Sequence, residues 1–296
     1  MKYSTAIWFL VLLVLIWGLS WPINKVGLAY TSPSNYMELR FVIGTLAMFL
    51  IAWVGKHLKM PRRKDLPIIL TVGFFQMAAM MNLANYGLSL IEAGQATFLA
   101  FTVSVWVIPI SAFLDLKFSF LEGLSFLVGI LGICFLIQLW NIGDSPAWKG
   151  YLLLLLSAFS WAVGILCARH MKWHRPLLQL LPWQLLLATL CTFVIAQFQG
   201  ISLLPNTADP IFIGSLLYTG VISIAIGYWL MILIGKHLSP AITSLGLLFV
   251  PILSLGVSTL FLHEQIPLNV AGGVILLTLG SLIHIYSGRK NAQNLP

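Results

Sequence analysis

Charged residues are scarce in this chain. Asp, Glu, Lys and Arg make up 8% of its 296 residues, whereas 59% are hydrophobic and the mean hydropathy is +0.97. A soluble globular protein carries about 25% charged residues, so most of this chain cannot face water. The composition excludes a soluble enzyme or binding module and predicts an integral membrane protein.

Motifs that carry chemistry are also missing. The sequence has no Gly-x-Ser-x-Gly elbow, no phosphate-binding loop and no His-Glu-x-x-His motif, which are the patterns of several hydrolase, nucleotide-binding and zinc-enzyme families. The three cysteines, Cys134, Cys167 and Cys191, form no close pair, and we expect them to be small packing residues. No His and Cys cluster has metal-ligand spacing. We therefore expect no enzymatic activity, no metal and no cofactor.

Long apolar runs divide the chain into ten segments. Each has about the 20 residues that a helix needs to cross a bilayer, and none shows the alternation of a membrane-barrel strand. The predicted helices cover residues 4–29, 34–55, 67–89, 93–114, 120–140, 150–170, 177–199, 210–234, 240–261 and 267–287. Several are preceded or opened by proline, as helix starts tolerate. The predicted fold class is an all-α integral membrane protein with ten transmembrane helices.

The ten segments form a pattern of five that occurs twice. The stretch Leu152–Arg169 aligns with Trp8–Lys25 at an offset of 144 residues, and Trp161 then falls on Trp17. Further along each half the offset becomes 148 residues. The chain therefore divides into two related halves.

We expect the first five-helix repeat at residues 1–148 and the second at residues 149–296. An odd number of spans in each half places the two halves in the membrane upside down relative to each other. Inverted repeats mark many secondary transporters, whose substrate site lies between the halves near the bilayer midplane. The repeat thus predicts both the architecture and a transport function.

The basic residues predict the orientation. If the N-terminus is cytoplasmic, only Lys25, Arg40 and Lys149 of the 16 basic residues lie towards the outside. Cytoplasmic loops of membrane proteins carry such an excess of Lys and Arg, so both termini should be cytoplasmic. The net charge of +8 then suits anionic lipid headgroups. Nucleic acid is not expected as a partner, because no soluble basic face exists.

Four charged residues of the predicted helices are candidates for a gate or a structural cluster. Lys25, Glu38 and Arg40 lie near the outer end of the first two helices, and Arg169 is the repeat partner of Lys25. Charges inside a bilayer are functional candidates. Two interpretations stay open: a structural salt-bridge cluster, or gate charges, one of which meets an anionic group of the substrate.

Polar and aromatic side chains in the predicted helices are candidates for substrate contact. Trp17, Trp21 and Asn24 follow i, i+4, i+7 spacing and share one helix face. Tryptophan usually lies at the membrane interfaces, so indoles at mid-depth suggest a pocket for an amphipathic solute of about amino-acid size. The candidate set is Trp17, Trp21, Asn24, Asn82, Asn85, Tyr86, Thr97, Trp161, Tyr228 and Thr243. Each of these residues could instead make a helix–helix contact.

Short motifs in both halves resemble one transporter family. The first half has Trp17-Gly18, Pro22, Lys25 and Arg40-Phe41 in that order. The second half has Trp161-Ala162, Arg169, Pro251, Glu264, Gly272 and Gly280. In this order, over nearly the whole chain, they resemble the EamA branch of the drug/metabolite transporter superfamily. One departure is the family's Gly-Glu-Arg-like turn, which reads Leu-His-Glu-Gln in the second half and Asp115-Leu116-Lys117, without the glutamate, in the first.

The resemblance implies a ten-helix inner-membrane carrier. It implies a central cavity lined by the first, third, fourth, sixth, eighth and ninth helices, and export of amino acids or related small metabolites by alternating access. An exporter of drugs or toxic cations is an alternative, but it predicts an acidic residue in the cavity, and no Asp or Glu falls near a helix middle. The lack of a buried carboxylate also favours facilitated diffusion or exchange over proton coupling.

A non-transporting membrane protein is the remaining alternative. The sequence leaves the oligomeric state open between a monomer and a homodimer.

Overall fold

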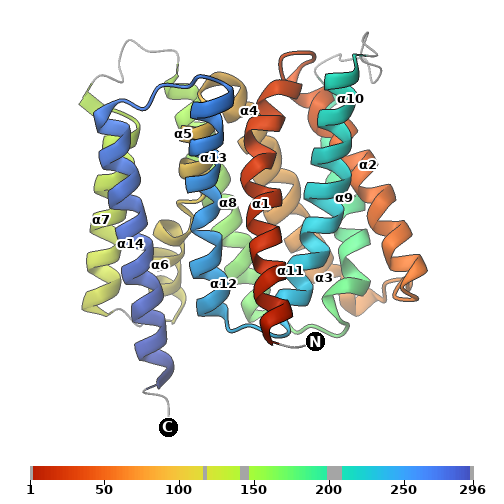
Figure 1. Cartoon of the computed structure of the whole chain (residues 1–296). Helices are drawn as coiled ribbons and strands as arrows, with labels where there is room; N and C mark the ends of the chain where they lie inside the picture. The colour runs from red at the N-terminus through yellow and green to blue at the C-terminus, as the bar shows by residue number, and fades with distance from the viewer. Residues whose placement is uncertain (1–2, 116–118, 141–146, 199–208, 294–296) are drawn as a thin grey trace.

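In the part of the chain that the structure describes, the helical segments form ten rods, whose arrangement is drawn in Figure 1. The computed structural model describes residues 3–115, 119–140, 147–198 and 209–293. In these residues every regular element is helical, and nine of the ten rods are long and apolar enough to cross a membrane. The remaining rod, Phe120–Leu136, is the fifth along the chain; it is apolar but has only 17 residues. The chain is an all-helical multi-pass membrane protein, which confirms this part of the prediction.

Six rods are single helices and four are made of shorter pieces. The single helices are α1 (Tyr3–Gly27), α2 (Pro33–Val54), α7 (Phe120–Leu136), α8 (Trp148–His170), α9 (Leu177–Phe198) and α14 (Leu268–Gln293). The third rod contains η1 (Arg63–Asp65), α3 (Leu66–Thr71), η2 (Val72–Ala79) and α4 (Met80–Leu90), and the fourth contains α5 (Ala93–Ala100) and α6 (Val103–Asp115). The eighth contains α10 (Pro210–Leu217), η4 (Tyr218–Ile226) and α11 (Gly227–Gly235), and the ninth α12 (Pro240–Leu247) and α13 (Phe249–Phe261).

The composite rods are interrupted at matching places in the two halves. The third and eighth rods each contain a π-helical segment, and η4 begins 146 residues after η2. The fourth rod breaks at Phe101 and Thr102, and the ninth breaks at Leu248, which is 147 residues after Phe101. π-Helical turns often occur at functional sites, and irregular backbone at membrane depth is tolerated where it lines a cavity. The repeat in the sequence is therefore visible in the backbone as well.

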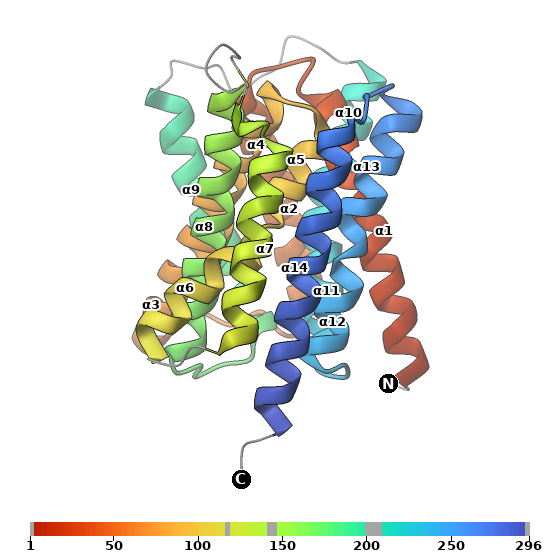
Figure 2. The ribbon, with the colours of Figure 1, turned by 90° about the vertical axis from the view of Figure 1, so that its left-hand side faces the viewer.

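The first helices of the two sequence repeats, α1 and α8, run in opposite directions. The first and last described residues, Tyr3 and Gln293, lie at the same end of the bundle (Figures 1 and 2). We call this end the terminal end and the opposite end the distal end. Lys25 near the finish of α1 and Gly150 near the start of α8 both lie against Ile91 at the distal end. One helix thus finishes where the other begins.

Apolar side chains join rods from the two halves. One buried group connects α2, α3, η2 and α9, a second connects α4, α5, α7, α8 and α14, and a third connects α1 with α11. In a bilayer, moving an apolar side chain from lipid to a helix contact gains little hydrophobic free energy, because lipid tails are equally apolar. Close packing must therefore hold these rods together.

The pair α7 and α14 packs most closely, at one side of the bundle (Figure 1). A Cβ atom on Gly273 would lie 2.9 Å from the Gly132 carbonyl oxygen, so only glycine allows the backbones to approach this far. Beside this contact, the Ser125 hydroxyl donates to the carbonyl of Gly280 at 2.7 Å. Small residues and hydrogen-bonding hydroxyls are the usual means by which membrane helices associate.

Some predicted boundaries differ from the structure. The fifth helix was expected to reach residue 140, but α7 finishes at Leu136 because Gln138 adopts a φ of 52°, which a continuing helix does not allow. The third rod begins at Arg63 instead of residue 67, because Asp65 accepts a hydrogen bond from the Arg62 backbone amide and starts a 3₁₀ turn. The last helix continues to Gln293, beyond the expected residue 287.

Candidate functional site

Two adjoining cavities lie between the rods. The distal cavity has a volume of about 100 Å³ and the terminal cavity a volume of about 530 Å³. Four aromatic side chains line both of them: Trp17, Phe101, Trp161 and Tyr228. We call these four the aromatic quartet. The quartet therefore forms the boundary between the two cavities.

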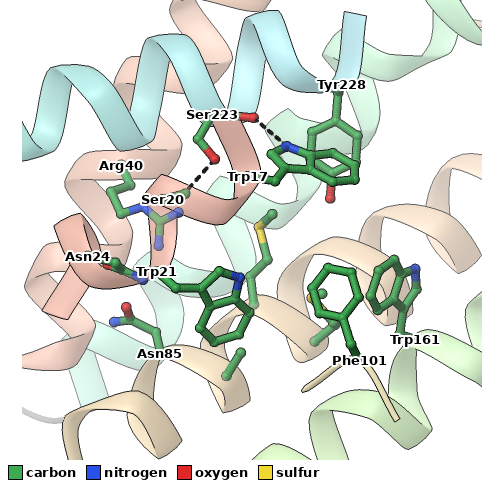
Figure 3. A pocket seen from close by; sticks show the side chains of 13 residues that line it. Trp17, Ser20, Trp21, Asn24, Arg40, Asn85, Phe101, Trp161, Ser223 and Tyr228 are labelled. Atoms are coloured by element: carbon green, nitrogen blue, oxygen red, sulfur yellow. Dashed lines mark hydrogen bonds between the residues drawn. The ribbon is translucent and has the colours of Figure 1, made fainter. Parts of the chain in front are cut away.

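The quartet consists of two edge-to-face pairs. The Trp17 and Tyr228 ring centroids are 5.9 Å apart at 67°, and those of Phe101 and Trp161 are 5.7 Å apart at 88°. The Trp17 indole N–H donates to the carbonyl oxygen of Ser223 at 3.1 Å, as Figure 3 shows. Edge-to-face geometry is favourable for aromatic rings, and a buried indole N–H needs an acceptor. Each pair joins one rod of the first half to one rod of the second half, so a relative movement of the halves would change the boundary.

The distal cavity is polar on one side. Ser20, Asn24, Arg40 and Asn85 line it and are all buried. Figure 3 shows the Arg40, Asn24 and Asn85 side chains gathered on the side away from Phe101 and Trp161. The hydroxyl of Ser223 donates to that of Ser20 at 2.9 Å.

Several polar atoms around this cavity have no partner. The Asn85 amide nitrogen donates to the Pro33 carbonyl at 2.7 Å, and its oxygen accepts no hydrogen bond. The Asn24 side-chain oxygen and Nε of Arg40 are likewise buried without a partner. Buried polar groups in proteins are almost always hydrogen-bonded. These three groups therefore indicate a site for a polar part of a ligand.

The terminal cavity is mostly apolar and reaches the surface. Its volume falls in the range of about 300–1,000 Å³ typical of small-molecule sites. Trp173, in the loop between α8 and α9 and 40% exposed, lines it at the terminal end. Gln184 of α9 also lines it, fully buried, with both amide atoms unpartnered. Among the described residues, no Asp or Glu lines either cavity.

At the distal end two charged side chains, Lys25 and Glu264, bind backbone groups, and we call this pair the distal seal. The Lys25 ammonium donates to the carbonyls of Leu88 and Ile91 at 2.8 and 2.6 Å. The Glu264 carboxylate accepts from the amides of Ala93 and Gly94 at 2.6 and 2.9 Å. Because Ala93 and Gly94 open α5, the carboxylate lies at a helix N-terminus, where unpaired amides and the helix dipole favour negative charge.

Glu92 lies beside the distal seal, between α4 and α5. Burial raises the pKa of the Glu92 carboxyl, and the carboxylate of Glu264 raises it further, while the ammonium of Lys25 lowers it. The three charges are thus coupled electrostatically at this end of the molecule.

Six of the ten predicted substrate contacts lie together around the distal cavity. They are Trp17, Trp21, Asn24, Asn85, Trp161 and Tyr228. The other four line neither cavity and make hydrogen bonds between or within helices. These bonds are Asn82 to the Ala78 carbonyl and the Thr192 hydroxyl, Tyr86 with Ser34, Thr97 to the Ala93 carbonyl and with Ser254, and Thr243 to the Ser239 carbonyl.

The four predicted charges lie in different places. Lys25 belongs to the distal seal, and Arg40 lines the distal cavity. Glu38 is 2% exposed and lies outside the lining of both cavities, with one carboxylate oxygen unpartnered. Arg169 is exposed in the last turn of α8, at the terminal end.

Sequence reasoning missed several residues of the site, among them Ser20, Gln184 and Phe101. Ser20 follows Trp17 by three positions, so the spacing that selected Trp21 and Asn24 also predicts it. Gln184 is a polar residue within an apolar helix, which is a recognisable signal. Phe101 carried no signal, because a phenylalanine in an apolar run is ordinary; its position became evident only from the break in the fourth rod.

Comparisons with known proteins agree with this architecture. A model of the EamA-like transporter family matches residues 4–138 and again residues 148–286. The chain is 25% identical over 277 residues to the uncharacterized transporter YoaV of Bacillus subtilis (strain 168), covering 92% of this chain and 94% of that protein. It is 29% identical over 291 residues to a probable amino-acid metabolite efflux pump of Escherichia coli (strain K12), covering 94% of each. A solved protein structure matches with a TM-score of 0.65 at 16% identity over 98% of each chain, which is a likeness of fold.

Proposed function

The chain belongs to the EamA-like transporter family, and we propose on that premise that it exports amino acids or related small metabolites by alternating access. It is a membrane transporter of this family and not an enzyme. The observation that carries the proposal is the pair of cavities joined at the aromatic quartet, sealed at the distal end and reaching the surface at the terminal end. Secondary transporters place their substrate between their two repeats in this way.

The substrate contacts we propose are the six predicted residues that line the distal cavity, together with Phe101. With Arg40, which also lines this cavity, they suit an amphipathic solute, because two amides and the guanidinium lie on one side of the cavity and the aromatic quartet lies on the other. The relative from Escherichia coli is named for amino-acid metabolite efflux, and solutes of that size and polarity fit this lining.

The orientation we propose places the terminal end in the cytoplasm, with both termini inside and the halves inverted about residue 148. Opposite directions of α1 and α8 support the inversion. The loops that follow α2, α8 and α11 lie at the terminal end (Figure 1) and carry Lys59, Lys172 and Lys236. Cytoplasmic loops are enriched in such residues, and an inner membrane follows for a bacterial-type carrier.

The state of the molecule corresponds, on this orientation, to an inward-facing carrier. Export then requires the distal seal to open and the terminal cavity to close. The matching interruptions in the third, fourth, eighth and ninth rods support such a movement, because backbone irregularities concentrate bending at a few positions. The residue that aligns with Glu264 in the first half is Leu116, which lies outside the described residues. A leucine has no carboxylate, so it cannot bind the first amides of α12 at the terminal end as Glu264 binds those of α5 at the distal end.

Counterflow in proteoliposomes tests this function. The purified chain is reconstituted, loaded with an unlabelled amino acid and assayed for uptake of the labelled form across a panel of amino acids, with and without an imposed pH gradient. We expect saturable counterflow of one class, independent of the gradient. Flux of cationic drugs without flux of amino acids would favour the drug-exporter alternative. Absence of any flux would favour a non-transporting protein.

A further inference from the structure

Arg40 is a buried cation without a carboxylate partner. Its side chain is 6% exposed, lies in the membrane-spanning helix α2 and lines the distal cavity. Its nearest recorded contacts are Sδ of Met37, 3.6 Å from one guanidinium nitrogen, and the Tyr36 ring, whose centroid is 5.9 Å from Cζ. Within the described part of the chain, no Asp or Glu forms an ion pair with it.

An isolated charge in this position is energetically costly. Arginine keeps its charge under all conditions relevant to proteins, and a buried charge normally needs a partner of opposite sign. Glu38 is two residues away, which places its side chain on the opposite side of α2. The sulfur of Met37 and the ring of Tyr36 lower the energetic cost of burying the guanidinium, but neither neutralises its charge. The site therefore lacks one anion.

The surroundings of Arg40 define the shape of that anion. The distal cavity is small, at about 100 Å³, and one side of its lining is polar. A carboxylate group suits this small polar space better than an apolar group does. The aromatic quartet stands at the boundary to the terminal cavity, where about 530 Å³ is available for an apolar body.

The unpartnered amide oxygens of Asn24 and Asn85 face the same cavity. Amide oxygens accept hydrogen bonds, so they can bind an ammonium or hydroxyl group next to the carboxylate. Neither amide carries a negative charge, so an amino group gains hydrogen bonds here but no ion pair. The only fixed charge that the described residues present to this cavity is positive.

We propose that Arg40 binds the carboxylate of the substrate, and that the substrates are monocarboxylates with an apolar body, for which an amino group helps but is not required. The inference rests on the proposed transport function and specifies its substrate class. It predicts that a 2-oxo or 2-hydroxy acid is recognised and that the amide of the same amino acid is not. The guanidinium suits this role because its planar fork matches a carboxylate with two parallel hydrogen bonds.

A matched series of leucine analogues tests the proposal. The analogues are L-leucine, 2-hydroxy-4-methylpentanoate, which lacks the amino group, and L-leucinamide, which lacks the carboxylate. Binding is measured on the purified full chain by quenching of tryptophan fluorescence, since three of the lining residues are tryptophans. We expect leucine and the hydroxy acid to bind, and leucinamide to bind at least about tenfold more weakly, because removing one partner of a buried charge pair is costly.

Two variants assign the effect to Arg40. In Arg40→Gln we expect the preference for leucine over leucinamide to fall at least about tenfold, and in Arg40→Lys to fall less, because the charge stays while the fork is lost. Lys149→Gln removes an exposed cation at the start of α8 and serves as the matched control, with the wild-type preference unchanged. Gel filtration and thermal unfolding establish that each variant is folded.

The outcomes separate this proposal from the transport function. Equal binding of leucine and leucinamide to the wild type would overturn it, even if Arg40→Gln fails to fold. A folded Arg40→Gln variant with the wild-type preference would overturn it as well, and would leave a structural role for Arg40 against Tyr36. Counterflow without carboxylate preference would retain the carrier and reject the role of Arg40. Carboxylate binding without any counterflow would support the role of Arg40 and reject the carrier function.

Discussion

At the scale of single residues, the site depends on side chains that are held from two sides. Trp17 is fixed by its bond to the Ser223 carbonyl and by its contact with Tyr228. Asn85 is fixed by its bond to Pro33, which leaves its oxygen directed at the cavity without a partner. Such supported side chains keep a binding geometry defined before the ligand arrives, which reduces the cost of binding.

Gly227 should be required for the position of Trp17. A Cβ atom at residue 227 would lie 2.5 Å from Trp17 Nε1, which is closer than real contacts allow. In Gly227→Ala we expect the indole to shift, the bond to Ser223 to break and the thermal stability to fall, because overpacking typically costs about 1–3 kcal/mol. Counterflow rate and melting temperature are the measurements.

Gly235→Ala is the matched control for this prediction. Gly235 lies in the same helix, α11, and nothing would lie within 4 Å of an added Cβ atom there. Equal loss of transport in both variants would show that the helix itself, and not the indole position, is sensitive.

Sequence reasoning at this scale could find helix faces but not cavities. The spacing of Trp17, Trp21 and Asn24 placed them on one face, and all three line the distal cavity. Asn82 and Thr97 showed the same type of signal, yet the structure pairs them with Thr192 and Ser254. A polar side chain in a membrane helix needs a partner in either case, and whether that partner is protein or ligand depends on tertiary packing.

At the scale of elements, the distal seal is a contact between the two halves. Glu264 comes from the loop between α13 and α14, and it binds the first amides of α5 in the other half. Hydrogen bonds to charged groups contribute about 1.5–3 kcal/mol, so this contact favours the closed distal end. In the proposed transport cycle, the seal breaks whenever the distal end opens.

In Glu264→Gln we expect the distal end to open more often. The neutral amide keeps a weaker bond and loses the attraction of the helix N-terminus for negative charge. A loss of about 1.4 kcal/mol raises the open population about tenfold. Ala84→Cys, a small residue that lines the distal cavity, reports this as the rate of labelling by a membrane-impermeant thiol reagent in a chain without the native cysteines.

The control for this experiment is Glu122→Gln. Glu122 also accepts a backbone amide, that of Ser119, but within the start of α7. Its loss should leave the labelling rate of Ala84→Cys unchanged. An unchanged rate in Glu264→Gln, or an equal rise in both variants, would reject the seal.

Helix positions were predictable at this scale, but the interruptions were not. Apolar length alone places the ten rods, because each must match the bilayer thickness. The π-helical segments Val72–Ala79 and Tyr218–Ile226 keep the same apolar composition as their neighbours, so nothing in hydropathy marks them. They follow from how the rods pack around the cavities, which the sequence does not state locally.

At the scale of the whole molecule, residues of both halves form the main structural features. Both contribute rings to the aromatic quartet, both contribute to the distal seal, and α7 and α14 join them at one side. The repeat and the family could be predicted from the sequence, because alignment and motif order are linear properties. The cavity volumes and the contacts of the distal seal could not, because they depend on how the halves pack against each other.

The orientation of the molecule can be tested by labelling from one side. In a chain without native cysteines, Lys59→Cys lies in an exposed loop at the terminal end and Gln265→Cys in an exposed loop at the distal end. We expect an impermeant thiol reagent added to intact cells to label Gln265→Cys, and to label Lys59→Cys only after permeabilisation. The reverse pattern would place the termini outside and make the molecule outward-facing.

In the proposed function, substrate passes through the cavities joined at the aromatic quartet. The most direct test of this route compares counterflow by Trp17→Ala with counterflow by Trp148→Ala, using the amino acid that the wild type exchanges fastest. Trp17 lines both cavities, whereas Trp148 is 44% exposed at the start of α8 and lines neither. With equal amounts of protein reconstituted, we predict that the counterflow rate of Trp17→Ala is at least about tenfold below that of the wild type, because removing an aromatic anchor of a binding site typically costs about 2 kcal/mol or more. We predict that the rate of Trp148→Ala equals that of the wild type. Wild-type counterflow by Trp17→Ala would contradict the account.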